Sequence, residues 1–282
     1  MARSLSDLIP NQVPELIAGG FQFTEGPVWH PDNYLLFSDI PADTIYRWTS
    51  TKGIEPYINP SRHSNGLTFD SQGRLIACEH GGRQVSRMAG DGVMQTVADR
   101  YQGKRLNSPN DVVIHSNGGI YFTDPAYGIE PMESELNFQG VFRINIDMSV
   151  ELLLSDFKAP NGLAFSPDES TLYVDDSRRR QTWAYQLSPE GHLNNGCIFV
   201  DQDVEDPGNP DGMKVDVEGN IYITGGGGLW VVDSDGHHMG TVRFSELPSN
   251  IAFGDEDLCS IYVTARTSIY RIRSNIPGTK VL

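Results

Sequence analysis

The sequence has few cysteines and no long hydrophobic run. Its three cysteines, Cys78, Cys197 and Cys259, are widely separated and form no CxxC pair, which argues against a disulfide framework. No apolar run approaches the roughly 18 residues of a membrane span, and residues 1–7 contain no apolar stretch of signal-peptide length. We therefore expect a soluble, cytoplasmic protein without a membrane partner.

Positive charge is also scarce. The chain has 21 Lys and Arg against 37 Asp and Glu, which gives a formal net charge of −16. Because proteins hold phosphate backbones with clusters of Lys and Arg, this balance argues against a nucleic-acid partner. An acidic surface suits a protein that binds cations, but acidity also serves solubility alone and identifies no ligand.

Long helical periodicity is missing throughout, which argues against a parallel α/β architecture. The chain has no GxSxG elbow and no Walker GK[ST] motif, so serine-hydrolase and nucleotide-hydrolase functions lose support. The seven histidines form no HxH or HExxH pair, which disfavours a zinc site.

The sequence does contain an internal repeat. Six segments share one pattern, and their first residues are separated by 40, 45, 51, 50 and 38 positions. The segments are EGPVW from Glu25, NGLTF from Asn65, NDVVI from Asn110, NGLAF from Asn161, DGMKV from Asp211 and SNIAF from Ser249. Each is followed by an Asp-, Asn-, Ser- or Gly-containing turn and a second apolar run, which predicts a β-hairpin. A period of 40 to 50 residues is typical of propeller blades.

Further strand-like stretches, such as Thr44–Trp48 and Gly140–Ile144, lie between the hairpins and bring each repeat to about four strands. The fold class predicted is therefore all-β, a six-bladed β-propeller, with residues 1–282 forming a single domain. A strand around Leu16–Ala18 is a candidate to complete the last blade and close the ring.

The first residue of each repeat is chemically informative. These positions are Glu25, Asn65, Asn110, Asn161, Asp211 and Ser249, and every side chain bears oxygen. Equivalent positions of a propeller lie at equivalent places around the central channel, where converging carboxylates and amides need a cation between them. Turn chemistry is the alternative, since Asn and Asp often begin strands, and we expect it to hold for Asn65 and Ser249.

An all-oxygen set favours Ca²⁺, with Mg²⁺, Mn²⁺, Fe²⁺ and Zn²⁺ as open alternatives. We predict Glu25, Asn110, Asn161 and Asp211 as the metal ligands. Other residues are expected near the rim of this site. Asp124 ends the second strand of its hairpin, and His80 and Arg83 follow another; we predict substrate contacts for them, with an ordinary turn or an inert loop as the alternative. Residues 128–137 interrupt the third repeat and are either a lid over the active face or an acidic insertion without a role.

Longer motifs carry a family resemblance. They are FTEGPVW, LNSPNDVV, YFTDPAYG, FQGVFRI, PNGLAFSPDE and NPDGMKVDVEGNIYIT, spread between Phe23 and Thr224. With them the chain resembles the SMP-30/gluconolactonase/regucalcin family of six-bladed propellers. The resemblance implies hydrolysis of a sugar-acid lactone such as gluconolactone, with metal ligands at Glu25, Asn161 and Asp211. Asn110 is implied as a further ligand or substrate contact. Ser108 stands where animal regucalcins have Arg, so their sugar contacts cannot be carried over.

Lactone hydrolysis needs a polarised carbonyl, an activated water and a stabilised oxyanion, and a metal with open positions serves all three. We assign Asp211 as the catalytic base that accepts the water's proton. Two alternatives stay open: a metal-dependent organophosphate or ester hydrolase of the same fold, and a non-enzymatic propeller that binds proteins. The sequence leaves the natural lactone open, and it does not decide between a monomer and a homo-oligomer.

Overall fold

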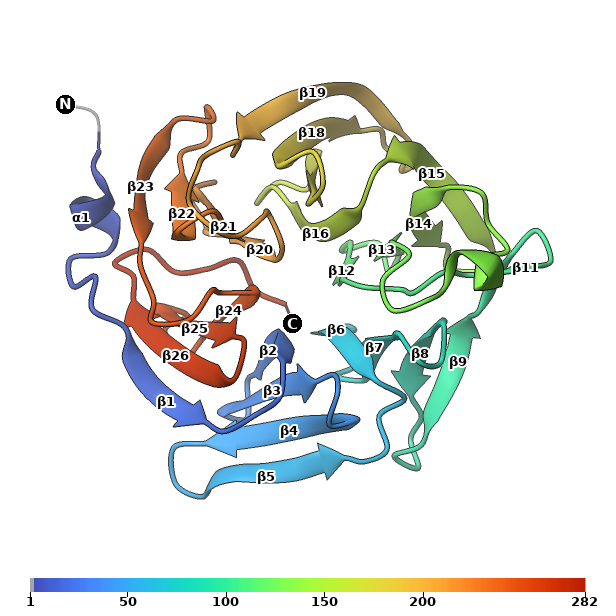
Figure 1. Ribbon diagram of the computed structural model, residues 1–282, viewed down its shortest axis with the longest axis horizontal. Coiled ribbons are helices and arrows are strands. Elements are labelled where there is room, and N and C mark those ends of the chain that lie inside the picture. Colours follow the sequence, from blue (N-terminus) through green and yellow to red (C-terminus); the bar gives the residue numbers. More distant parts are fainter. Residues whose placement is uncertain (1–2, 282) are drawn as a thin grey trace.

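Six four-stranded antiparallel sheets surround a central axis (Figure 1). The computed structural model describes residues 3–281. The prediction of a six-bladed β-propeller is confirmed, and each blade contains one of the six repeats at its innermost strand.

The blades follow one another along the chain, innermost strand first. The first and second blades are β2 (Thr24–His30), β3 (Tyr34–Asp39), β4 (Thr44–Thr49) and β5 (Gly53–Ile58), then β6 (Ser64–Phe69), β7 (Leu75–Glu79), β8 (Gln84–Met88) and β9 (Met94–Ala98). The third and fourth are β12 (Val112–Ile114), β13 (Ile120–Asp124), β14 (Gln139–Ile144) and β15 (Val150–Phe157), then β16 (Pro160–Phe165), β17 (Thr171–Asp176), β18 (Gln181–Leu187) and β19 (Leu193–Asp201). The fifth and sixth are β20 (Met213–Val215), β21 (Ile221–Gly225), β22 (Gly228–Val232) and β23 (His238–Val242), then β24 (Asn250–Gly254), β25 (Ser260–Ala265), β26 (Ser268–Arg273) and β1 (Glu15–Gly19).

The last blade takes its outer strand from the other end of the chain. Strand β1 pairs antiparallel with β26, with Glu15 opposite Arg271 and Gly19 opposite Ser268. Arg271 also donates hydrogen bonds to the Glu15 carboxylate. The expectation that Leu16–Ala18 completes the last blade is confirmed, and this pairing closes the ring of blades.

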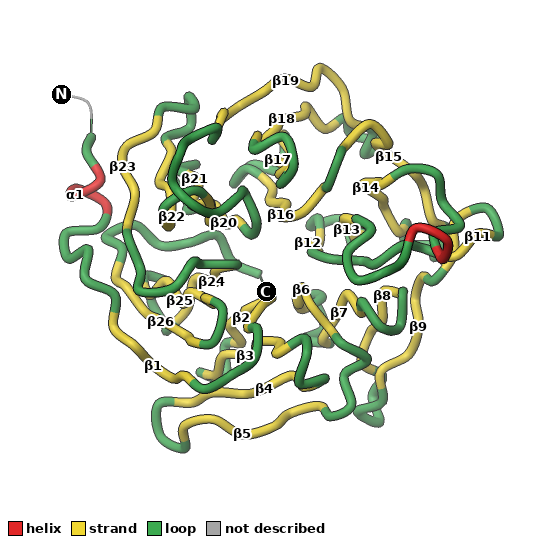
Figure 2. The backbone as a smooth tube through the Cα atoms, in the orientation of Figure 1, coloured by secondary structure: helices red, strands yellow, loops and turns green. Residues whose placement is uncertain are grey.

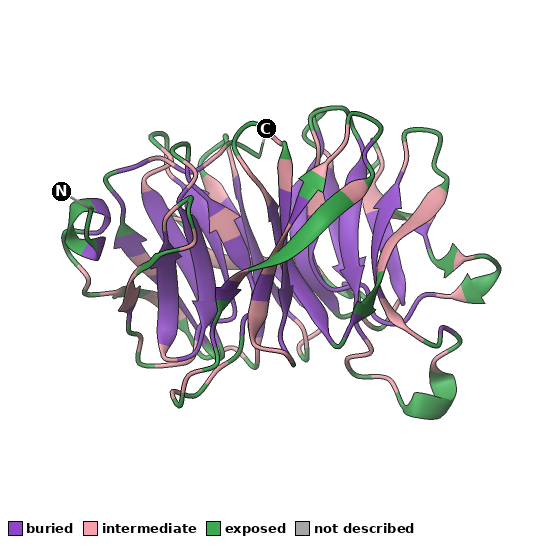
Figure 3. Ribbon diagram, turned by 90° about the horizontal axis from the view of Figure 1, so that it is seen from above, coloured by how far each residue is buried: buried purple, intermediate pink, exposed green. Residues whose placement is uncertain are grey.

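Apolar side chains fill the spaces between neighbouring blades. Trp29 of β2 stacks on Tyr262 of β25 with ring centroids 5.2 Å apart, and Phe165 of β16 meets Tyr121 of β13 edge-on at 5.1 Å. Buried residues run through the inner strands, while exposed residues gather on outer strands and loops (Figure 3). Aromatic contacts of this kind add to the hydrophobic burial that holds blade to blade.

Direct backbone hydrogen bonds join the inner strands around the axis. Gly66 N donates to Asn110 O at 2.8 Å, and Gly162 N donates to Asp211 O at 2.6 Å. A Cβ atom on Gly162 would lie 2.1 Å from Asp211 O, so no larger residue fits there without displacement. A glycine follows the first residue in four of the six repeats, and at Gly66, Gly162 and Gly212 its N–H bonds the next repeat's first residue. These contacts hold the first residues in one ring.

Regular structure outside the blades is short. It comprises the helix α1 (Leu5–Leu8), the two-stranded hairpin β10 (Arg100–Tyr101) and β11 (Lys104–Arg105), and the 3₁₀ turn η1 (Pro131–Glu133). Figure 2 shows η1 as the red segment beside the third blade. Across residues 3–281, none of the helices has the length and apolar character needed to cross a membrane.

Candidate functional site

A cavity of about 360 Å³ opens where the first residues of the repeats meet. Glu25, Asn110, Asn161 and Asp211, the four predicted metal ligands, all line it. They come from four different blades, and the backbone contacts described above set their positions. The predicted substrate contact His80 lines the same cavity, together with Asn65 and Ser249.

The two carboxylates of this ring lie in an environment that disfavours their charge. Glu25 is 3% exposed, and its Oε2 accepts a hydrogen bond from Gly26 N at 2.8 Å. Burial, and to a lesser degree the charge of Asp111, raises the pKa of Glu25 to about 7. Burial and the charge of Glu25 raise the pKa of Asp211 well above its usual range. Two buried carboxylates that repel each other are stabilised in their ionised form when a divalent cation lies between them.

Hydrogen bonds fix the orientation of the Asn161 amide. Its Nδ2 donates to Ser177 Oγ at 3.0 Å, and Ser177 Oγ in turn donates to Pro210 O at 2.6 Å. Because the nitrogen is engaged in this chain of hydrogen bonds, the carbonyl Oδ1 is the atom that Asn161 offers to a cation. Together Glu25, Asn110, Asn161 and Asp211 therefore supply an all-oxygen donor set, and the residues present fit a Ca²⁺-type ion.

Asn65 and His80 form a polar pair on one side of the cavity. Asn65 Nδ2 lies 3.2 Å from His80 Nε2, and burial lowers the pKa of His80 to about 4. The imidazole is therefore neutral near pH 7 and accepts the amide's hydrogen bond at Nε2. Asn65 Oδ1 is buried without a hydrogen-bond partner among the described residues. Ser249 Oγ, in contrast, donates to Thr24 O at 2.8 Å, a contact between blades.

Most of the chain matches a known protein family. Residues 23–267 match the family model of the SMP-30/Gluconolactonase/LRE-like region. The chain belongs to this family. A gluconolactonase from Zymomonas mobilis is 33% identical over 94% of this chain and 82% of its own length. The pentonolactonase XacC from Haloferax volcanii is 32% identical over 85% of this chain and 80% of its own. The solved structure of XC5397 from Xanthomonas campestris, described as a gluconolactonase, superposes with a TM-score of 0.88 at 32% identity, covering 96% of this chain and 92% of that one.

Two predicted substrate contacts of this SMP-30-family chain lie outside the cavity. Asp124 is fully buried, and its Oδ2 accepts a hydrogen bond from Asn107 N at 2.8 Å. Arg83 Nε donates to Leu106 O at 2.8 Å and to Asn107 O at 2.9 Å. Both side chains therefore bind the backbone that leads to Asn110, and their contact with substrate stays a prediction.

The segment 128–137 packs onto the same backbone. Arg83 Nη1 donates to Glu133 O at 3.0 Å, and Ser134 Oγ donates to Asn107 Oδ1 at 2.8 Å. None of residues 128–137 lines the cavity. The turn η1 projects from the face opposite the one where the described chain ends (Figure 3).

The sequence-based prediction missed four polar residues that line the cavity, Tyr127, Ser177, Asn209 and Arg266. Ser177 directly follows the second strand of its blade, and Tyr127 lies three residues after the second strand of its own. Tyr127 belongs to the YFTDPAYG motif, so the motif itself held the missed signal. The opposite wall is largely apolar, with Phe23, Ile40 and Leu247.

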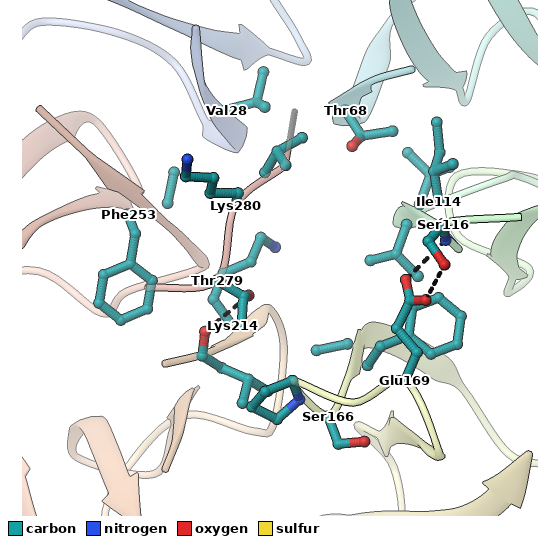
Figure 4. Close-up of a pocket in the computed structure, with 18 of the residues that line it drawn as sticks. Val28, Thr68, Ile114, Ser116, Ser166, Glu169, Lys214, Phe253, Thr279 and Lys280 are labelled. Carbon is teal, nitrogen blue, oxygen red and sulfur yellow. Dashed lines mark hydrogen bonds between the residues drawn. The ribbon is translucent and has the colours of Figure 1, made fainter. Parts of the chain in front are cut away.

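A larger cavity of about 470 Å³ lies farther along the inner strands. Figure 4 shows its wall, with Val28, Ile114 and Phe253 on several blades and Lys214 beside Thr279. It contains none of the predicted site residues. The four predicted metal ligands converge at the smaller cavity instead.

Proposed function

We propose that this chain hydrolyses a small sugar-acid lactone to its hydroxy acid, using a divalent cation, Ca²⁺ first among the candidates. Family membership and the relatives named for lactone hydrolysis support a hydrolase of carboxylic ester bonds. The observation that carries the proposal is the meeting of Glu25, Asn110, Asn161 and Asp211, from four blades, in one cavity.

The donor set supports the choice of ion. Every one of the four side chains offers oxygen, which suits Ca²⁺ better than Zn²⁺. A bound divalent ion supplies polarisation of the lactone carbonyl and a lowered pKa for a water molecule. The remaining work belongs to the protein's own residues.

Asp211 is the residue that we assign to accept the proton of the attacking water. Its side chain is partly open to the cavity, whereas Glu25 is 3% exposed. Burial and the charge of Glu25 raise the pKa of Asp211, which makes it a stronger base than an ordinary carboxylate when it is ionised. The apolar wall at Phe23 and Leu247 limits water on the other side of the substrate.

Elemental analysis of the purified protein, combined with a panel of sugar lactones and an organophosphate before and after EDTA, tests this proposal. We expect one bound divalent ion and EDTA-sensitive hydrolysis of an aliphatic lactone. Activity that survives complete metal removal would overturn the mechanism. Preference for the organophosphate would favour the second hydrolase function, and a metal-loaded protein inert toward all substrates would favour a binding module.

A further inference from the structure

Tyr127 lines the cavity beside the proposed ligands and is not one of them. Tyr127 follows the end of β13 and lines the cavity with Asn161, Ser177 and Asp211. Burial, and to a lesser degree the charge of Asp211, raises the pKa of Tyr127, so its phenol is protonated near pH 7. The phenol therefore borders the space in which a substrate would meet the ion.

The hydrogen-bond donors of Ser177 and Asn161 already have acceptors. Ser177 donates its single hydroxyl proton to Pro210 O. Asn161 donates from Nδ2 to Ser177 Oγ, and its amide also interacts with the Asp211 carboxylate. Among the described residues, no hydrogen bond of the Tyr127 phenol meets the usual distance and angle limits, so an oxygen atom in the cavity can receive its proton.

The backbone next to Tyr127 is anchored on both sides. Ala126 N donates to Gln139 Oε1 at 2.8 Å, and Gln139 Nε2 donates to Lys158 O at 2.7 Å. These bonds connect the Tyr127 loop to β14 and to the connection that leads into the fourth blade. A donor held in this way needs little reorganisation when charge develops opposite it.

We propose that Tyr127 donates a hydrogen bond to the ring oxygen of the lactone as that oxygen leaves. The inference rests on the proposed function. Water adds to the carbonyl carbon and gives its proton to Asp211; the bond from that carbon to the ring oxygen then breaks, and its electron pair stays on the ring oxygen. Tyr127 stabilises this alkoxide until the proton held by Asp211 returns to it, which gives the hydroxy acid and restores the Asp211 carboxylate. A bound ion would polarise the carbonyl oxygen, which would leave the ring oxygen as the substrate atom for the phenol.

The test compares two lactones whose leaving oxygens differ. The ring oxygen of gluconolactone leaves as an aliphatic alkoxide, which needs stabilisation. The ring oxygen of dihydrocoumarin leaves as a phenolate, whose charge the aromatic ring already stabilises. For Tyr127→Phe we expect kcat to fall about 10- to 100-fold on the aliphatic lactone and less than about 3-fold on dihydrocoumarin, with KM nearly unchanged. Tyr101→Phe, in the β10–β11 hairpin, is the matched control and should change neither value.

Metal content and thermal unfolding of Tyr127→Phe supply readouts besides activity. We expect both to match the wild type, because the substitution removes one oxygen that does not hold the ion. Equal losses on both lactones, or a loss of bound metal, would overturn the role at the leaving oxygen. A wild-type protein inert toward both lactones would instead overturn the proposed function, and this role with it.

Discussion

Asn161 and Ser177 are joined by a hydrogen bond of 3.0 Å that determines which end of the Asn161 amide faces the cavity. Ser177 is held in turn by its bond to Pro210 O, next to Asp211 in sequence. One hydroxyl therefore connects the fourth blade's proposed ligand to the backbone that carries the fifth blade's ligand.

Ser177→Ala removes this connection without removing a ligand. The Asn161 amide is then free to turn its nitrogen toward the ion. An amide NH₂ group offers no lone pair to a cation, so the ligand would be lost in that orientation. We expect Ca²⁺ affinity to fall by about 10- to 100-fold, as is usual when a residue that orients a ligand is lost. Calorimetric titration of EDTA-treated protein measures this. Ser170→Ala, in an exposed turn, is the control, and an unchanged affinity in Ser177→Ala would contradict the orienting role.

Glu25→Gln tests whether Glu25 holds the ion, by its effect on protein stability and without a measurement of catalysis. Ca²⁺ at about 100 times its dissociation constant should stabilise the EDTA-treated wild type by roughly 3 kcal/mol. The variant keeps the shape of Glu25 but loses one negative charge, so most of this gain should vanish. Thermal unfolding with and without Ca²⁺ measures the difference. Glu190→Gln, an exposed acid away from the cavity, should retain the full gain, and an equal gain in Glu25→Gln would argue against the ligand assignment.

The repeat made it possible to predict from sequence that the four proposed ligands meet in one cavity. Glu25, Asn110, Asn161 and Asp211 begin equivalent inner segments, and a propeller carries equivalent positions to equivalent places around its axis. The same logic predicted the closing strand at Leu16–Ala18. Periodic features could be predicted because each blade repeats one geometry.

Tyr127 could not be predicted in this way, because its loop differs from those of the other blades. Ser177 could have been, because the first residue after the second strand lines the cavity in four blades, at Ile40, His80, Ser177 and Arg266. Asp124 ends a second strand near the ring, but its carboxylate turns toward Asn107 N instead. Which way such a side chain points depends on the local backbone, which the repeat does not determine.

Gly162→Ala tests the contact between neighbouring inner strands. The added Cβ would lie 2.1 Å from Asp211 O and break the hydrogen bond from Gly162 N. Since both groups belong to backbones that cannot easily move apart, we expect a loss of roughly 2 to 4 kcal/mol in the free energy of unfolding. Urea denaturation measures this. Gly90→Ala, where the added carbon meets no atom within 4 Å, is the control and should change stability little.

The Asp124 carboxyl should make the free energy of unfolding depend on pH. Burial raises the pKa of its carboxyl from 3.8 to about 7, even though Asn107 N donates to it. The folded protein therefore binds this proton more tightly than the unfolded chain does. The protonated Asp124 carboxyl therefore contributes to the free energy of unfolding. This contribution is fully present below pH 3.8 and is lost as the pH rises to about 7; above that pH, the titration of Asp124 changes stability no further.

Asp124→Asn removes this titration while keeping an oxygen that can accept from Asn107 N. Relative to the variant, the wild type in EDTA should lose roughly 2 to 4 kcal/mol of unfolding free energy between pH 4 and pH 7. Urea denaturation of both proteins across this range gives the difference curve. Asp91→Asn, in an exposed turn, should give no comparable slope. A flat difference curve for Asp124→Asn would mean that the carboxyl titrates alike in the folded and unfolded chains, and that burial at the Asn107 backbone does not hold its proton.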